Sequence, residues 1–268
     1  MELIRNLIDR HKRGEAIGIT SVCSAHPLVI EATFRHALRN AAPLVLIEAT
    51  SNQVNQDGGY TGMVPVGFRA FVEEIAARTG FPLDRLALGG DHLGPNAWTA
   101  LPADEAMAKA EIMVADYVRA GFGKIHLDCS MSCADDPVPL PERTIAERAA
   151  RLCRAAEAAC RDDPALAPVY VIGTEVPVPG GAAEDLDALA VTTPEAALAT
   201  LDMHRDLFRE AGLDAAWDRV IATVVQPGVE FDHMKVVDYR PAAAAARSAA
   251  IVPVDHIVFE AHSTDYQR

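Results

Sequence analysis

The sequence predicts an α/β fold, a (β/α)8 TIM barrel, and three observations lead to this prediction. Apolar, β-branched runs alternate with helical patterns at intervals of about 35 to 45 residues, as in repeated right-handed βα units. Most of these runs are continuously hydrophobic, which is typical of parallel strands buried on both faces. Polar residues gather at the C-terminal end of each run. A barrel builds its site there from many strands, whereas an open sheet uses one switch point.

The expected strands are seven runs, one fewer than a barrel of eight strands requires. They span residues 16–26, 43–52, 85–95, 124–132, 169–177, 219–228 and 256–265. The sequence stops at "STDYQR", just past the seventh run. We expect either an eighth strand in a segment absent from this sequence or a non-standard element supplied by the N-terminal residues. Residues 1–268 are expected to form a single barrel domain that lacks the C-terminal part of a longer chain.

Helical patterns follow the first six runs, over residues 27–41, 64–80, 103–121, 144–163, 193–212 and, more weakly, 240–250. Gly80 is expected to end the second of these helices, because glycine adopts the left-handed conformation of a C-cap. Thr144 with Glu147 predicts a capping box in the fourth. Thr193 before Pro194 predicts an N-cap followed by the first helical residue. The stretch "MELIRNLIDRHKRGEAIGIT" is typical of a charged amphipathic helix rather than of a signal peptide.

The composition excludes several classes of protein. The net charge is −14 and no cluster of Lys and Arg offsets it, which argues against a nucleic-acid partner. No apolar stretch reaches the roughly 18 residues that a transmembrane helix needs. The five cysteines are an odd number in a chain large enough to need no disulfides, so we expect reduced thiols and a cytoplasmic protein.

The stretch "GGDHLGPN" places Asp91 and His92 at the end of the third expected strand. A histidine there can bind a divalent metal through a neutral ring nitrogen, and an adjacent aspartate can take or give a proton. The alternative is a turn between glycines, in which Asp91 and His92 satisfy backbone groups. The stretch alone leaves both interpretations open.

Three further candidates lie at or after the ends of later strands. Glu175 ends the fifth run, His233 lies in the loop after the sixth, and His262 ends the seventh. With His92 they would form a ligand set that suits zinc, manganese or a similar divalent metal acting as a Lewis acid on a carbonyl. Glu175 could instead act as a catalytic acid or base, or form a structural ion pair. A single histidine in a sequence is usually not a metal ligand.

The remaining candidates are expected to contact a substrate. They are Ser24, His26, Glu48, Asn52, His126, Asp128, Gly180, Gly181, Gln226 and Glu260. His126 and Asp128 are two residues apart on one expected strand and therefore face the same side. Gly180 and Gly181 allow a ligand to approach the backbone closely. The motifs GxxxxGK[ST] and GxGxxG are absent, so the sequence gives no support for ATP or NAD as a cofactor.

Several long motifs together resemble the GatZ/KbaZ family, the subunit associated with class II tagatose-1,6-bisphosphate aldolase. They are "VCSAHPLV", "IEATSNQVNQDGGYTGM", "LGGDHLGPN", "KIHLDCSMSCADDPVPL", "VIGTEVPVPGGA", "VVQPGVEFDH" and "FEAHSTDYQ". The resemblance runs from about residue 10 to the end of the sequence. It implies a TIM barrel related to the metal-dependent class II aldolases and a chain that continues past residue 268.

The resemblance to class II aldolases also implies roles for individual residues. Asp91 matches their proton donor and His92 a zinc ligand, while Glu175 resembles their downstream glutamate and His262 their last zinc histidine. Gln226 falls near the place of the middle zinc histidine, and His233 comes seven residues later. At this position the sequence therefore departs from the zinc-ligand pattern of the class II aldolases.

The family resemblance implies a role in galactitol, tagatose or N-acetylgalactosamine catabolism, with a ketohexose phosphate as ligand. The family is described as a non-catalytic subunit that stabilises the separate class II aldolase catalytic chain, and we expect this protein to be an oligomer. The alternative is a metal-dependent 4-epimerase that converts tagatose-6-phosphate to fructose-6-phosphate, or a lyase. A pure scaffold has no physical need for so many ionisable groups at a barrel mouth, because their burial is costly unless they are paired or bound to metal.

Overall fold

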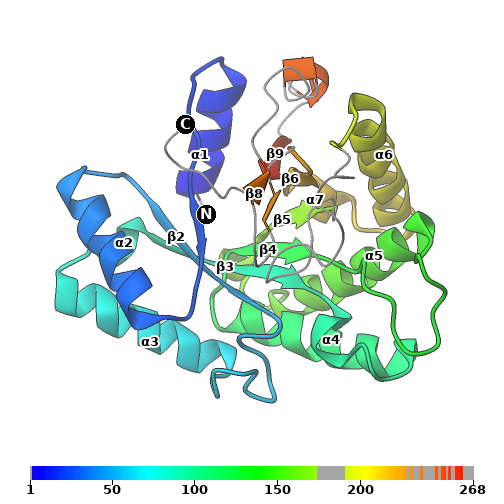
Figure 1. The fold of residues 1–268 in the computed structure, drawn as a ribbon, viewed down its shortest axis with the longest axis horizontal. Helices are drawn as coiled ribbons and strands as arrows, with labels where there is room; N and C mark the ends of the chain where they lie inside the picture. The colour runs from blue at the N-terminus through cyan, green and yellow to red at the C-terminus, as the bar shows by residue number, and fades with distance from the viewer. Residues whose placement is uncertain are drawn as a thin grey trace.

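Seven parallel strands form one curled sheet, as the hydrophobic runs predict (Figure 1). The computed structural model describes residues 2–173, 191–227, 230–231, 236–237, 245–246, 249–251, 253–254 and 257–261. The strands are β1 (Ser21–Cys23), β2 (Val45–Thr50), β3 (Leu86–Leu93), β4 (Lys124–Leu127), β5 (Val169–Ile172), β6 (Val220–Val225) and β9 (Val258–Ala261). They are hydrogen-bonded in that order, so each strand lies beside the one before it in the chain, as successive βα units require.

The sheet has the curvature of a TIM barrel that lacks one strand. β1 and β9 lie at its two edges, and each pairs with a single neighbour among the described strands. This confirms the predicted TIM-barrel-like fold, with seven of its strands among the described residues. A short antiparallel pair, β7 (Glu230–Phe231) and β8 (Val236–Val237), follows β6 and was not predicted. Two-residue strands are too short to show the periodicity by which strands are recognised in a sequence.

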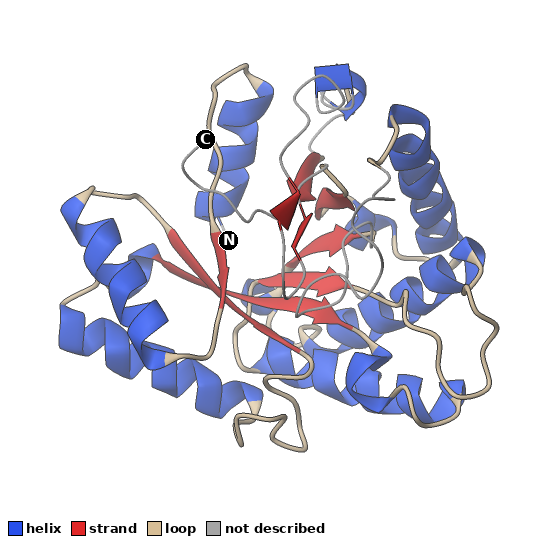
Figure 2. Cartoon of the chain, viewed as in Figure 1, coloured by secondary structure: helices blue, strands red, loops and turns tan. Residues whose placement is uncertain are grey.

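Helices flank the sheet, and those after the first cover its outer face (Figure 2). They are α1 (Glu2–Lys12), α2 (Pro27–Arg39), α3 (Pro65–Thr79), α4 (Ala103–Arg119), α5 (Glu142–Ala159), α6 (Pro194–Glu210) and α7 (Asp214–Trp217), with 3-10 turns η1 (Leu83–Arg85), η2 (Pro95–Trp98) and η3 (Pro164–Leu166). Among the described helices, none combines the length and the apolar character needed to cross a bilayer.

Of the three predicted helix caps, two are confirmed and one is wrong. Gly80 ends α3 in the left-handed conformation with φ 74°, and the side chain of Thr193 accepts a hydrogen bond from the amide of Ala196 at the start of α6. Both predictions are confirmed. The capping box at Thr144 is wrong, because α5 already begins at Glu142 and Thr144 lies inside it. The acidic side chain of Glu142 in the first turn favours this earlier start through the helix dipole.

Two separate cores lie on the two faces of the sheet. Alternate strand residues, Ile47 and Ile125 among them, pack against the outer helices in the larger core. The smaller core contains Ile4 and Ile8 of α1 with strand residues such as Val169. Because neighbouring strand residues point to opposite faces, this second core fills the concave side of the sheet. The N-terminal amphipathic helix therefore packs against strand residues of the concave side.

Candidate functional site

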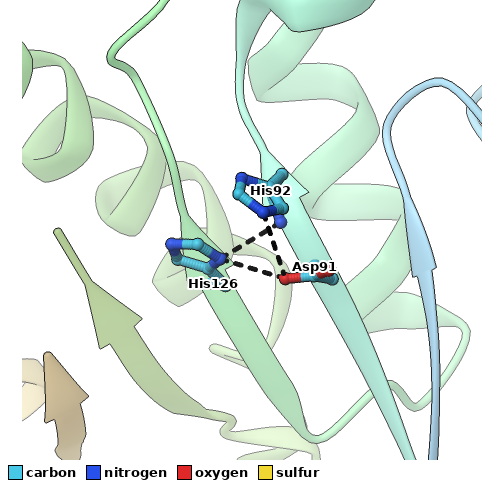
Figure 3. A group of neighbouring side chains, drawn as sticks. All are labelled: Asp91, His92 and His126. Atoms are coloured by element: carbon cyan, nitrogen blue, oxygen red, sulfur yellow. Dashed lines mark hydrogen bonds and ion pairs between the residues drawn. The ribbon is translucent and has the colours of Figure 1, made fainter. Parts of the chain in front are cut away.

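Asp91 and His92 both face the concave side of the sheet, although side chains of consecutive strand residues normally point in opposite directions. The pairing of β3 with β4 shifts register between Gly90 and Leu93, and His92 has φ 47°. A non-glycine residue in this left-handed region costs on the order of 1–3 kcal/mol. The bulge turns both side chains toward His126 on β4 (Figure 3).

Steric contacts require glycine at two positions of "GGDHLGPN". A Cβ on Gly94 would lie 1.6 Å from the carbonyl oxygen of Asp128, so only glycine lets these two backbones meet. A Cβ on Gly89 would lie 2.2 Å from Oε1 of Glu48 and would displace that carboxylate. The stretch is therefore a strand end built around neighbouring side chains, and the interpretation as an ordinary turn does not describe it.

The ring of His92 is oriented by Asp128. Nδ1 of His92 lies 2.6 Å from Oδ2 of Asp128, and the amide and hydroxyl of Ser130 donate to Oδ1 of the same carboxylate at 3.0 and 2.7 Å. Burial opposes the charged ring, but Asp91, Asp128 and Glu260 outweigh it and raise the pKa of His92 to about 9. With its Nδ1 proton donated to Asp128, His92 presents Nε2 to the site.

His126 is held in a fixed tautomer by two backbone groups. Its Nε2 donates to the carbonyl oxygen of Gly173 at 2.9 Å, and its Nδ1 accepts from the amide of His92 at 3.2 Å. Nδ1 also lies 3.1 Å from Oδ1 of Asp91. The single lone pair of this nitrogen is used by the His92 amide, so a cation bound at Nδ1 would have to displace that contact.

Asp91, His92 and His126 together offer the donor set of a divalent metal. Each provides one ligand atom, and the three atoms lie within 4.8 Å of one another. Burial raises the pKa of Asp91, but His92, His126 and Lys124 outweigh this effect and hold it well below its usual range. Two imidazoles and a carboxylate suit zinc or manganese. Asp128 and the carbonyl of Gly173 accept hydrogen bonds from the two rings and so fix their orientation, as histidine ligands of metals require.

A buried ion triad lies next to this set. Lys124 on β4 is 2% exposed, and its Nζ lies 2.8 Å from Oε1 of Glu48 on β2 and 2.7 Å from Oε2 of Glu260 on β9. Burial opposes the ammonium, but Glu260, Glu48 and Asp91 raise the pKa of Lys124 above its usual value. Burial raises the pKa of Glu48 to about 7. The interior of a TIM barrel is ordinarily filled by Val, Ile and Leu, so this charged layer is unusual.

The other predicted contacts lie in different surroundings. Nδ1 of His26 accepts from the amide of Leu28 and so caps α2, while Oγ of Ser24 accepts from the amide of His26. Asn52 is exposed, and Gln226 is buried with its backbone N–H donating to Oγ1 of Thr192. The predicted substrate contacts at these positions stay predictions.

Five predicted site residues lie outside the part of the chain that the structure describes. They are Glu175, Gly180, Gly181, His233 and His262. The predicted roles of His233 and His262 as metal ligands and of Glu175 as an acid or base therefore stay predictions.

Two residues of the site have roles that the sequence did not reveal. His126 was expected to contact substrate, yet it lies with Asp91 and His92, and Lys124 was not singled out at all. Both could have been found in "KIHLD", because its period of two places Lys124, His126 and Asp128 on one face of β4.

The motifs that carry the family resemblance include the strand ends that build this site. Residues 4–268 match the family described as "D-tagatose-1,6-bisphosphate aldolase subunit GatZ/KbaZ-like". The chain belongs to the GatZ/KbaZ-like family. It is also similar to a solved structure described as a probable tagatose 6 phosphate kinase from Sinorhizobium meliloti 1021, with 54% identity and a TM-score of 0.82. The match covers 93% of this GatZ/KbaZ-like chain and 59% of that structure, so the chain spans less than two thirds of its relative's length.

Proposed function

We propose that this chain is a subunit of a class II tagatose-bisphosphate aldolase complex, and that it binds a divalent metal and a ketohexose phosphate at the barrel mouth. Membership of the GatZ/KbaZ-like family supports the subunit role. The observation that carries the metal is the convergence of Asp91, His92 and His126 at strand ends of the barrel, where TIM-barrel enzymes build their sites.

The residues present fit a metal in charge as well as in type. Three carboxyl groups, those of Glu48, Asp91 and Glu260, lie around the ammonium of Lys124. A fourth, that of Asp128, pairs with the charged ring of His92, so the acidic groups outnumber the positive ones by four to two. Burying such an excess of negative charge is costly unless a cation balances it. A bound divalent metal would polarise the carbonyl of a ketose and stabilise the negative charge that develops there.

The residues around the proposed metal have separate roles. Asp128 and the carbonyl of Gly173 orient the two histidines, so that one ring nitrogen of each faces the site. Asp91 acts in this arrangement as a ligand atom rather than as the proton carrier expected from the sequence, because His92, His126 and Lys124 lower its pKa and keep it ionised. Burial in the barrel excludes water from this part of the site and strengthens each electrostatic contact.

The second candidate function is a 4-epimerase or lyase that acts without the aldolase subunit. In a retro-aldol step, the C4 hydroxyl loses its proton, the C3–C4 bond breaks, and its electrons move toward the carbonyl at C2. Re-addition to the other face of the aldehyde with return of the proton gives the 4-epimer. The ordered pair Asp91–His92 favours this candidate, because a scaffold alone does not require a left-handed histidine at a strand end.

Kinase activity, for which the similar structure is named, is not proposed for this chain. The stretch "GFGK" ends in Lys124, whose ammonium is buried between Glu48 and Glu260 and so is not available to a nucleotide phosphate. A phosphate-binding loop needs its lysine free to reach the phosphates.

One experiment separates the two candidates. The purified full-length protein is incubated with tagatose-6-phosphate and Zn²⁺ or Mn²⁺, and fructose-6-phosphate is followed over time. Turnover by the wild type that falls at least 100-fold in H92A, with H36A unchanged, establishes the epimerase. His36 is the matched control because it is exposed on α2. Absence of turnover, together with co-purification of a class II aldolase catalytic chain, establishes the subunit role instead.

A further inference from the structure

The ion triad and the candidate metal set meet at one residue, Asp91. Besides the set of Asp91, His92 and His126, a second group of potential ligands consists of Glu48, Asp91 and Glu260. The ligand atoms of this second group also lie within 4.8 Å of one another. Asp91 therefore lies between two clusters of cation ligands, one rich in nitrogen and one made of carboxylates.

In the carboxylate cluster, one oxygen of Glu48 lacks a hydrogen-bond donor. Glu48 is 1% exposed, and within the described part of the chain its Oε2 atom has no hydrogen-bond partner. Its Oε1 accepts from the ammonium of Lys124, in space that Gly89 leaves open for it. A buried carboxylate oxygen without a donor is costly, so Glu48 depends on the cation that Lys124 supplies.

Lys124 holds the place of a cation in that cluster. Its Nζ lies 2.8 Å from Glu48 and 2.7 Å from Glu260, the carboxylates of two strands that are not neighbours in the sheet. An ammonium brings one positive charge and three donors to this position. A metal would bring two charges and shorter bonds, but it cannot share the position with Nζ at these distances because the two cations repel each other.

We propose that the barrel contains two cation positions bridged by Asp91, and that the ammonium of Lys124 is the built-in cation of the second. This proposal rests on the proposed metal position at His92 and His126. Lys124 keeps Glu48 and Glu260 from acting as metal ligands, so the protein holds a single divalent ion. That ion then has few protein ligands and keeps coordination positions open for substrate, as catalytic sites require.

The test counts Mn²⁺ ions bound per chain by equilibrium dialysis and records the electron paramagnetic resonance spectrum of the full-length protein. The wild type is expected to bind one ion with a mononuclear spectrum. K124M is expected to bind two, with an exchange-coupled spectrum because the positions share Asp91. The matched control is K109M, which removes an exposed lysine paired with Asp57 and is expected to bind one ion.

Two double variants locate the second ion. E48Q/K124M is expected to lose it, and H92A/K124M is expected to keep it while losing the first. If K124M does not fold, K124Q replaces it, because an amide can still donate to Glu48 or Glu260 and yet carries no charge. Folding of each variant is checked by near-ultraviolet circular dichroism.

The outcomes separate this proposal from the proposed function. A folded K124M or K124Q that binds no more Mn²⁺ than the wild type overturns the second position, whatever the wild type binds. A wild type that binds no ion, with K124M binding one that E48Q removes, supports the second position and contradicts the metal position at His92 and His126.

Discussion

At His92, the chain adopts a backbone conformation that is unfavourable for any residue with a Cβ. This conformation places the neighbouring side chains of Asp91 and His92 on one face of the sheet. The glycines around it accept contacts that no other residue fits, as Gly94 does against Asp128. The residue types could be read from "GGDHLGPN", but the bulge could not, because only a few per cent of non-glycine residues adopt a positive φ and the enrichment of histidine among them is too small to predict one. The site of three ligands was therefore only partly predictable.

Replacing Gly94 tests this steric explanation. G94A is expected to lower the free energy of unfolding by about 2–3 kcal/mol, because the new methyl group would overlap the Asp128 carbonyl oxygen. The displaced Asp128 should also weaken Zn²⁺ binding at least tenfold through His92. Urea denaturation and zinc titration measure the two effects. The control is G18A, where a Cβ meets no atom within 4 Å, and its stability should change by less than about 0.5 kcal/mol. An unchanged G94A would refute the steric explanation.

At the scale of elements, the strands were predicted because buried parallel strands read as continuous hydrophobic runs. The predicted runs extend past the strand ends, since β4 stops at Leu127 whereas its run continues to residue 132. Those polar extensions carry the site residues. Helix starts were less predictable, because Thr144 has the composition of a cap but lies inside α5. The helix dipole and the preceding proline, rather than the capping residues, set that boundary.

A buried histidine on helix α6, His204, makes the free energy of unfolding depend on pH. His204 is 3% exposed, and burial lowers its pKa to about 4. Its ordinary pKa is 6.5, so between pH 6.5 and 4 the unfolded chain binds a proton that the folded chain does not. The free energy of unfolding should therefore fall on acidification through this window, by on the order of 3 kcal/mol, and stay unaffected above it.

The variant H204L should remove this part of the pH dependence. Urea denaturation of the wild type, H204L and the surface control H36L between pH 4 and 8 measures it. If H204L shows the same loss of stability on acidification as the wild type and H36L, His204 does not cause the loss.

At the scale of the whole molecule, the concave side of the sheet is divided into layers. An apolar layer contains Ile4 and Ile8 of α1, and a charged layer centred on Lys124 lies beside the candidate ligands Asp91, His92 and His126. The fold class could be predicted from the alternation of hydrophobic runs with helical patterns, together with the polar residues at the strand ends. The packing of α1 against the concave side and the ion triad across β2, β4 and β9 could not, because contacts between distant segments leave no local pattern.

The central claim is that Asp91, His92 and His126 bind one divalent metal. A crystal structure of the full-length protein with Zn²⁺, with anomalous differences recorded at the zinc edge, tests it most directly. We predict one peak about 2.0–2.2 Å from a carboxylate oxygen of Asp91, Nε2 of His92 and Nδ1 of His126. A zinc ion bound by His233 and His262 without His126, or His126 still donating to Gly173 with no ion at its Nδ1, would contradict it.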